Sequence, residues 1–368
     1  MNYLIPFIIL ITVVVFIHEY GHYYFAKKFG VGITDFSIGF GKEIFGWHDK
    51  AGTRWKICWI PLGGYVKFFG DRNVFSQSEQ QKVINNYDLK DRKKLFILKP
   101  LYQRSIIVAA GPLANFVLAI LIFFFINVFA GKDLTPAIIN EVQKDSPAFV
   151  SGLKKNDIIL SIDNNKVESI LEVSTFINTS TEEIIKFTVL RNDQKISKFI
   201  KPITVSGEDS LGNTVNKKII GIKLSPLNNK FNKTNLGPSK AMYYSLKEVW
   251  FVTTTSLKYV GKMLTGSGDS SQLGGPIKIA KITGQVAEHG IIPFLSIMAY
   301  ISISLGIINL FPIPMLDGGH LMFYFFEKIF GHPLSQKTQE NFFRIGLFLL
   351  LFLMFFVTFN DLKDLNLF

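Results

Sequence analysis

The stretch LIPFIILITVVVFIHEYGHYYFA, residues 4–26, decides the fold of this chain. It is about as long as the roughly 20 residues that cross the apolar core of a bilayer. No basic segment precedes it and no small-residue cleavage site follows it, so it differs from a cleaved signal peptide. The stretch therefore predicts a retained membrane-spanning helix. His18, Glu19 and His22 lie inside it, although ionisable groups within a bilayer are costly and seldom without a function.

Three further apolar stretches are long enough to span a membrane, at about residues 105–130, 293–311 and 342–359. The third continues toward residue 326 after a break at Pro312 and Pro314. Broken helices at membrane depth are tolerated mainly where the freed backbone lines a buried site or a water-filled cavity. The composition agrees, because 48% of the residues are hydrophobic and only 18% are charged, against about 25% charged in typical soluble domains. The expected fold is an α-helical integral membrane protein with four spans.

The net charge of +12 is compatible with a nucleic acid or with an anionic membrane surface. We expect the lipid bilayer and no nucleic acid, because many basic residues flank the apolar spans. They concentrate in residues 27–104 and recur in 327–344, which the positive-inside rule places in the cytoplasm. The termini and the long insert between the second and third spans are then expected on the other side.

The loop after the first span is rich in aromatic and β-branched residues punctuated by glycine. Its runs at about residues 37–47 and 56–70 are typical of hairpin strands. Trp47, Trp55 and Trp59 lie in this loop, and tryptophan is enriched where membranes meet water. The sequence thus predicts a membrane-associated β-hairpin within the first half of the protein, residues 1–130.

The insert after the second span is polar. Residues 131–225 are expected to form one small α/β domain, with a Ser-Pro-Ala helix start at residues 146–148. Its expected strands include Ile158–Ile162, Ile185–Leu190 and Ile219–Ile222. Residues 226–292 are expected to hold an amphipathic helix, at 240–264, and linker. Residues 293–368 complete the membrane part.

The sequence HEYGH at residues 18–22 is the H-E-x-x-H pattern on a helix. A spacing of four residues places His18 and His22 on nearly the same helical face, so that both imidazoles can bind one metal ion. Zinc in such a site lowers the pKa of a bound water to about 7, and Glu19 is placed to accept its proton. With Cys58 as the single cysteine, the zinc site must use histidine and carboxylate ligands.

A catalytic zinc site needs a third protein ligand and one open position. Asp317 is the best choice, because it lies in the proline-broken stretch NLFPIPMLDGGH, residues 309–320. His320 is a rival ligand, and an interfacial turn that leaves Asp317 in water is the simpler alternative. The Asn309 amide is suited to hold a substrate backbone or a developing oxyanion.

Together, HEYGH, NLFPIPMLDGG and GPLAN (residues 111–115) resemble the site-2 protease family of intramembrane zinc metalloproteases, in its bacterial RseP-type form. The resemblance implies that His18, His22 and Asp317 bind zinc and that Glu19 is the catalytic base. It also implies that Asn309 assists the transition state, that Asn115 supports the site or the substrate, and that the hairpin guides substrate.

The same resemblance implies a PDZ-like domain in the insert, where residues 146–163 resemble a PDZ core. It further implies a bacterial inner-membrane protein, with the PDZ-like insert on the periplasmic side and the active site toward the cytoplasm. The expected partners are single-span membrane substrates in regulated intramembrane proteolysis, such as an anti-sigma factor or remnant signal peptides.

One feature departs from the RseP pattern, because the insert has room for one complete PDZ module where the best-known members carry two. A size filter made of paired modules is therefore not expected. Two functions from other classes stay open: a catalytically silent scaffold that presents a PDZ module, and a metal transporter that uses intramembrane histidine and aspartate.

Overall fold

The computed structural model describes residues 3–70, 87–208, 214–226, 232–266 and 274–364. The chain divides into two compact units. Unit 1 comprises Met1–Ile122 and Ser270–Phe368, and unit 2 is Phe123–Asp269. Unit 1 is thus built from both ends of the sequence, and each unit is described by itself.

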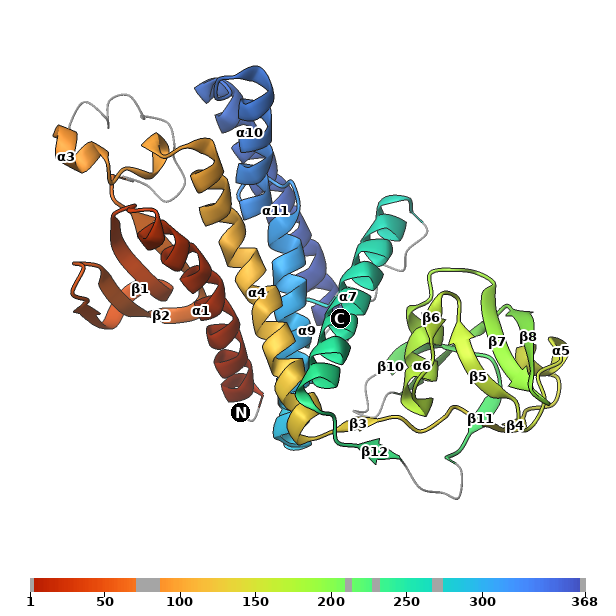
Figure 1. Cartoon of the computed structure of the whole chain (residues 1–368). Coiled ribbons are helices and arrows are strands. Elements are labelled where there is room, and N and C mark those ends of the chain that lie inside the picture. Colours follow the sequence, from red (N-terminus) through yellow and green to blue (C-terminus); the bar gives the residue numbers. More distant parts are fainter. Residues whose placement is uncertain (1–2, 71–86, 209–213, 227–231, 267–273, 365–368) are drawn as a thin grey trace. The chain divides into compact units, whose positions relative to one another are not determined.

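Four helices among the described residues are long and apolar enough to cross a membrane. They are α1 (Leu4–Lys28), α4 (Leu101–Phe129), α9 (Ile291–Leu310) and α11 (Gln336–Asp364). In unit 1, α1 and α9 run in one direction while α4 and α11 run in the other (Figure 1). Each of the four expected apolar stretches corresponds to one of these helices. The last helix begins earlier than expected, at Gln336.

A short irregular segment separates α9 from α10 (Asp317–Phe330). Pro312 and Pro314 lie in this segment, and proline can neither donate the backbone hydrogen bond of a helix nor avoid a clash with the preceding turn. The expected continuation of the third span is therefore a separate helix. Asp317 is its first residue, where the partial positive charge of the helix N-terminus favours a carboxylate.

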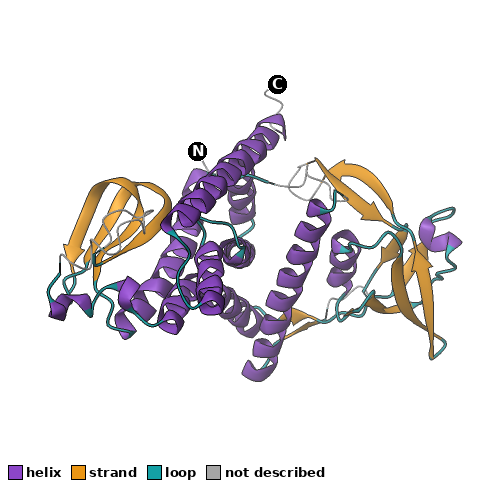
Figure 2. Cartoon of the chain, turned by 90° about the horizontal axis from the view of Figure 1, so that it is seen from above, coloured by secondary structure: helices purple, strands orange, loops and turns teal. Residues whose placement is uncertain are grey.

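Strands β1 (Ile33–His48) and β2 (Arg54–Phe68) form an antiparallel sheet with several register shifts. Ser37 pairs with both Lys56 and Tyr65, so the first half of β1 lies between the two halves of β2. The sheet is consequently curved (Figure 2). The expected hairpin is present, and many of its large apolar side chains are exposed, Phe45 at 61% and Trp59 at 68% among them.

Among the described residues of unit 1 there are also three short helices: α3 (Leu89–Arg92), the 3₁₀ turn η1 (Phe96–Leu98) and α8 (Pro276–Glu288). Helix α8 packs on α1, where Gly284 leaves room for Tyr3. The carboxylate of Asp361, near the end of α11, accepts hydrogen bonds from three backbone N–H groups at the start of α8. This contact supplies the cap that the helix lacks locally and joins α8 to the last span.

Unit 2 contains the α/β domain. One sheet has the order β6 (Asn165–Lys166), β5 (Ile158–Ile162), β7 (Ile185–Arg191) and β8 (Gln194–Ile200). Three further pairs join β3 (Lys132–Asp133) to β12 (Lys233–Thr234), β4 (Ile139–Val142) to β11 (Ile222–Leu224), and β9 (Ile203–Glu208) to β10 (Thr214–Ile219). Its helices are α5 (Pro147–Val150), α6 (Ile170–Thr179) and the amphipathic α7 (Pro238–Leu264).

Most of the helices and strands expected in unit 2 are present, but the prediction of one strand is wrong. Ser146 caps α5, as the Ser-Pro-Ala start predicts. The strand expected at Ile219–Ile222 is instead the end of β10 and the start of β11, because Gly221 turns the chain with φ +79°. Part of the linker expected within residues 226–292 lies outside the described residues.

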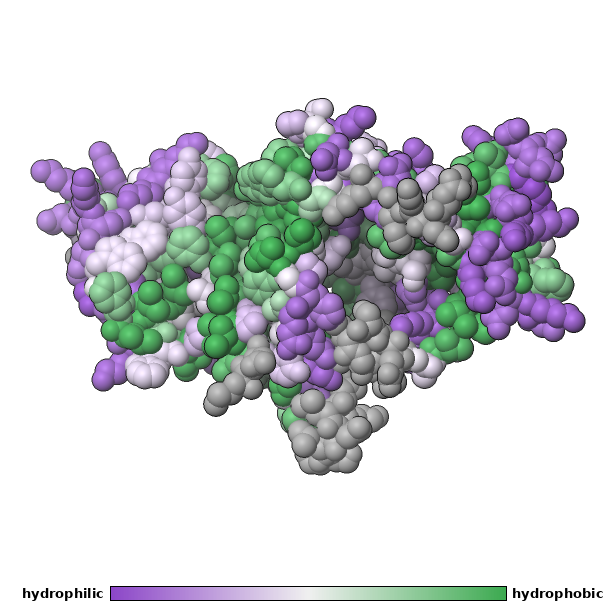
Figure 3. All heavy atoms as spheres, turned by 90° about the horizontal axis from the view of Figure 1, so that it is seen from below, coloured by the Kyte–Doolittle hydropathy of each residue, from purple (hydrophilic) through white to green (hydrophobic). Residues whose placement is uncertain are grey.

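Figure 3 shows apolar side chains over the helical part of unit 1 and mostly hydrophilic ones over the α/β domain at the right.

Candidate metal centre

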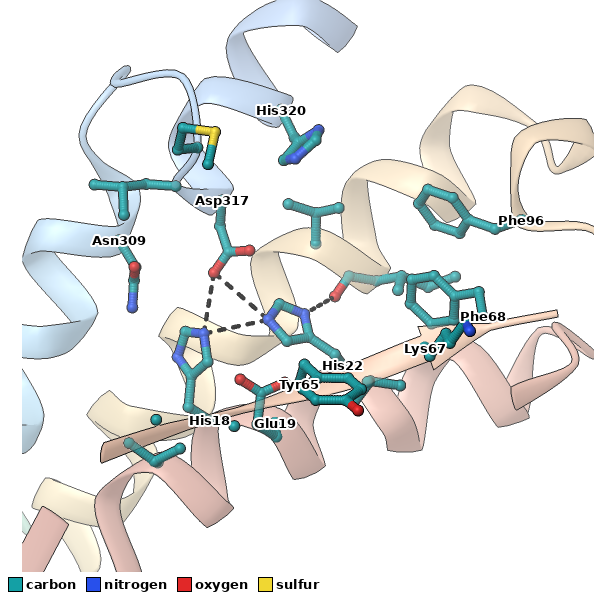
Figure 4. A pocket seen from close by; sticks show the side chains of 18 of the residues that line it. His18, Glu19, His22, Tyr65, Lys67, Phe68, Phe96, Asn309, Asp317 and His320 are labelled. Atoms are coloured by element: carbon teal, nitrogen blue, oxygen red, sulfur yellow. Dashed lines mark hydrogen bonds and ion pairs between the residues drawn. The ribbon is translucent and has the colours of Figure 1, made fainter. Parts of the chain in front are cut away.

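The two histidines of α1 and the first residue of α10 come together although some 300 residues separate them along the chain (Figure 4). His18 Nε2 lies 3.1 Å from Asp317 Oδ2, and His22 Nε2 lies 3.5 Å from the same oxygen. The two Nε2 atoms are 3.3 Å apart. Among the described residues, this is the group of three that could hold a metal ion.

The donor atoms fit zinc. Bonds of about 2.0–2.2 Å at tetrahedral angles place neighbouring ligand atoms about 3.3 Å apart, which matches the three distances. Asp317 Oδ2 is buried and accepts no hydrogen bond from the described residues. A buried carboxylate oxygen without a partner is costly, and a cation between it and two imidazole nitrogens removes that cost. Two histidines and a carboxylate also leave the fourth position open, as in catalytic zinc sites.

The Nδ1 atom of each histidine, on the side of the ring away from Asp317, faces a polar group of α4. His22 Nδ1 lies 2.8 Å from the backbone carbonyl oxygen of Ile107 in α4, to which it donates a hydrogen bond when Nε2 faces a metal. His18 Nδ1 lies 3.2 Å from the side-chain nitrogen of Asn115, also in α4. Helix α4 therefore contacts the Nδ1 atoms of both histidines.

Two glycines allow α1 and α4 to approach closely enough for these contacts. A side chain at Gly21 would collide with the Ala110 carbonyl, and one at Gly111 would collide with His22 Nε2. Gly111 begins the GPLAN motif, so a signal for this contact was present in the sequence. Gly21 lies inside HEYGH, but the metal-binding pattern by itself does not indicate this contact.

A cavity of about 470 Å³ opens at the site. Glu19 lines it beside the histidines, and so does the end of β2 from Gly63 to Phe68 (Figure 4). Gly64 packs against Glu19 and Val15, where a larger residue would meet the Ser37 carbonyl. The hairpin is thus in direct contact with the H-E-x-x-H helix, and sequence reasoning did not identify Gly64, Tyr65 or Lys67 as lining residues.

The other predicted residues occupy different places. Asn309, near the end of α9, lines the cavity beside Asp317 (Figure 4). His320 also lines the cavity, but it is not in the ligand group and stands against Phe323 and Phe343. Asn115 is fully buried and is not among the cavity-lining residues. The group that could hold a metal ion thus includes Asp317 and not His320.

Helix α10, which begins at Asp317, contacts α4 through a charged pair. Arg104 of α4 donates two hydrogen bonds to the Glu327 carboxylate of α10 and lies over the Tyr324 ring. Both charged side chains are largely buried, with exposures of 15% and 17%. This paired contact fixes α10 at its far end and so helps to set the position of Asp317.

Among solved structures, the chain resembles the PDZ domain of an SdrC-like protein from Listeria monocytogenes. The match is 26% identical and covers 24% of this chain and 85% of that domain, with a TM-score of 0.20.

Curated relatives match the chain over nearly its whole length. A protein of Agrobacterium fabrum, provisionally named a zinc metalloprotease, is 39% identical and covers 99% of this chain and 96% of its own length. A protein of Rhizobium meliloti, also provisionally named a zinc metalloprotease, is 38% identical, and the match covers 99% of this chain and 97% of that protein. The metalloprotease MmpA of Caulobacter vibrioides is 34% identical, and the match covers 99% of this chain and 96% of that protein. A model of peptidase family M50 matches residues 6–353. With its zinc-binding motif, its apolar helices and this match, the chain belongs to peptidase family M50, whose members depend on zinc.

Proposed function

We propose that this protein is an intramembrane zinc metalloprotease that hydrolyses peptide bonds within transmembrane segments of other proteins. The observation that carries the proposal is the site of His18, His22 and Asp317, whose ligand atoms lie at zinc spacing inside a cavity formed by apolar helices. Glu19 stands beside them with its carboxylate in the same cavity.

His18, His22 and Asp317 would hold the zinc, which supplies Lewis acidity toward a water molecule and a substrate carbonyl when it is bound. Glu19 acts as the general base that accepts the proton of the attacking water and returns it to the leaving amine. The Asn309 side-chain amide donates a hydrogen bond to the substrate carbonyl oxygen as negative charge develops there. The apolar surroundings strengthen both interactions because they lower the local dielectric.

The substrate is proposed to bind as an extended strand. A helical peptide bond is shielded by its own hydrogen bonds, so the scissile segment must unwind before Glu19 and Asn309 can reach it. Residues 64–68 of β2 pair with β1 on one side and line the cavity. An unwound segment can therefore add to this strand by β-augmentation. The exposed apolar side chains of the hairpin suit contact with lipid.

The proposed location is the bacterial inner membrane. Basic residues at the end of α1, Lys27 and Lys28, and at the end of α10, Lys328, support a cytoplasmic position for this end of unit 1 by the positive-inside rule. The α/β domain would then face the periplasm as a single PDZ-like module. The substrates are proposed to be single-span proteins, such as an anti-sigma factor or remnant signal peptides.

The test is cleavage of a model single-span substrate by the purified protein in detergent, together with its zinc content. Replacing Glu19 by Gln removes the base and keeps the shape, so cleavage should fall by about 10²–10⁴-fold while about one zinc per chain is retained. Glu288→Gln is the matched control, because the same substitution at an exposed position of α8 should leave cleavage unchanged.

Equal cleavage by wild type and Glu19→Gln would contradict the assigned base. Zinc binding without cleavage of several substrates would favour the silent scaffold, although the complete set of His18, Glu19, His22 and Asp317 supports a working site. Metal movement across vesicles that does not depend on Glu19 would favour the transporter.

A further inference from the structure

Asn115 lies in the middle of α4, behind His18, and its side chain is fully buried. The amide nitrogen Nδ2 is 3.2 Å from His18 Nδ1, while the amide oxygen Oδ1 has no hydrogen-bond partner among the described residues. The backbone carbonyl of Asn115 accepts a hydrogen bond from Ser302 of α9 at 2.9 Å, so helix packing holds the residue in place. A buried amide with an unused acceptor, directly beside a predicted zinc ligand, requires an explanation.

The position of the hydrogen on the His18 ring decides which amide atom can face it. His18 Nε2 points at Asp317 and His22, so zinc binding requires its lone pair and leaves the hydrogen on Nδ1. An N–H group that faces an amide NH₂ group pairs two donors and forms no bond. Rotating the amide by 180° exchanges its nitrogen and oxygen without changing the shape of the side chain. Oδ1 then lies where Nδ1–H can donate to it.

We propose that Asn115 is a positioning residue for the metal, whose Oδ1 accepts a hydrogen bond from His18 Nδ1–H in the zinc-loaded protein. This inference rests on the proposed function, in that zinc binds at the Nε2 atom. The carbonyl of Ile107 does the same for His22, so α4 supplies one acceptor to each histidine. Such partners fix the ring orientation and raise the basicity of the ligand nitrogen.

The same geometry argues against a direct role toward substrate. Asn115 has no exposed surface and is separate from the cavity-lining residues, whereas Asn309 lines the cavity. The two asparagines of the family motifs therefore have different tasks: Asn309 faces the reacting bond, and Asn115 acts through His18.

The test measures zinc affinity, not activity, by chelator competition on the purified full-length protein in detergent. Asn115→Leu keeps the size and removes the acceptor, so the zinc Kd should rise by about 10–100-fold. Asn115→Asp keeps an acceptor oxygen toward His18 and should retain the wild-type Kd or lower it. Asn115→Ala removes the acceptor without adding bulk and should behave like the leucine variant, so a folding defect of one variant does not decide the outcome.

Ser302→Ala is the control, because it removes the hydrogen bond to the Asn115 backbone and leaves the amide in place, so the zinc Kd should not change. Wild-type zinc affinity in both Asn115→Leu and Asn115→Ala would overturn the proposal. Slower cleavage with an unchanged zinc Kd would also overturn it, since the amide would then act on substrate. Absence of zinc binding by the wild type would overturn the proposed function itself, which the wild-type titration shows separately.

Discussion

At the scale of single residues, the candidate metal centre depends on glycines, which have no side chain, as well as on the side chains that could bind the metal. Gly21 and Gly111 permit the close approach of α1 and α4. A methyl group at Gly111 would occupy the space next to His22 Nε2, the atom that lies 3.5 Å from Asp317 Oδ2. The motifs HEYGH and GPLAN therefore contain glycines that let α1 and α4 pack closely, in addition to the residues that could bind a metal.

Gly111→Ala should consequently abolish zinc binding while the protein still folds, because alanine is favoured over glycine within a helix by about 1 kcal/mol but collides with His22. Zinc content and thermal unfolding in detergent measure the two effects. Gly261→Ala on α7 is the matched control, since a side chain there meets no atom within 4 Å and zinc content should stay at the wild-type value. Full zinc occupancy in Gly111→Ala would show that the helices can separate without loss of the site.

At the scale of elements, helix α10 begins at Asp317 and is held near its other end by an ion pair with α4. The ion pair of Arg104 with Glu327 is largely buried, and removing one partner leaves the other charge uncompensated. The position of Asp317 therefore depends on a contact three helical turns away from it.

Glu327→Gln should destabilise the protein by about 1–3 kcal/mol and weaken zinc binding, because α10 loses its anchor on α4. Thermal unfolding and chelator competition measure these effects. Glu183→Gln makes the same change in the exposed pair with Lys201 (83% and 71% exposed), which should contribute about 0–1 kcal/mol. Equal behaviour of the two variants would mean that Glu327 does not anchor the helix.

At the scale of the whole molecule, the membrane unit is interrupted by an inserted unit with its own core and its own ion pair. Arg191 donates two hydrogen bonds of 2.7 Å to Asp157, which is 1% exposed. Burial raises the pKa of Asp157, but the bonds from Arg191 outweigh this effect and hold the pKa of the carboxyl below its usual range. Because the folded-state pKa is the lower one, the pair stabilises unit 2 above about pH 4 and less as the pH falls through that value.

Hydrogen-exchange protection of β5 and β7 should therefore fall as the pH is lowered from 6 toward 3 in the full-length protein. Asp157→Asn should show weaker protection at pH 6 and a smaller change with pH, because its side chain has no charge to lose. A pH dependence as steep as that of the wild type would assign the acid sensitivity to other carboxylates.

The sequence by itself determined the four apolar helices and the shared face of His18 and His22. Both are local properties, set by hydropathy over about 20 residues and by the helical period. It also named Asp317, but with His320 as a rival. The tertiary structure alone groups Asp317, and not His320, with the two histidines, places Asn115 behind His18 and brings the end of β2 to the cavity. These relations depend on how closely segments about 45 to 300 residues apart along the chain can approach one another, which packing at positions such as Gly111 and Gly64 controls.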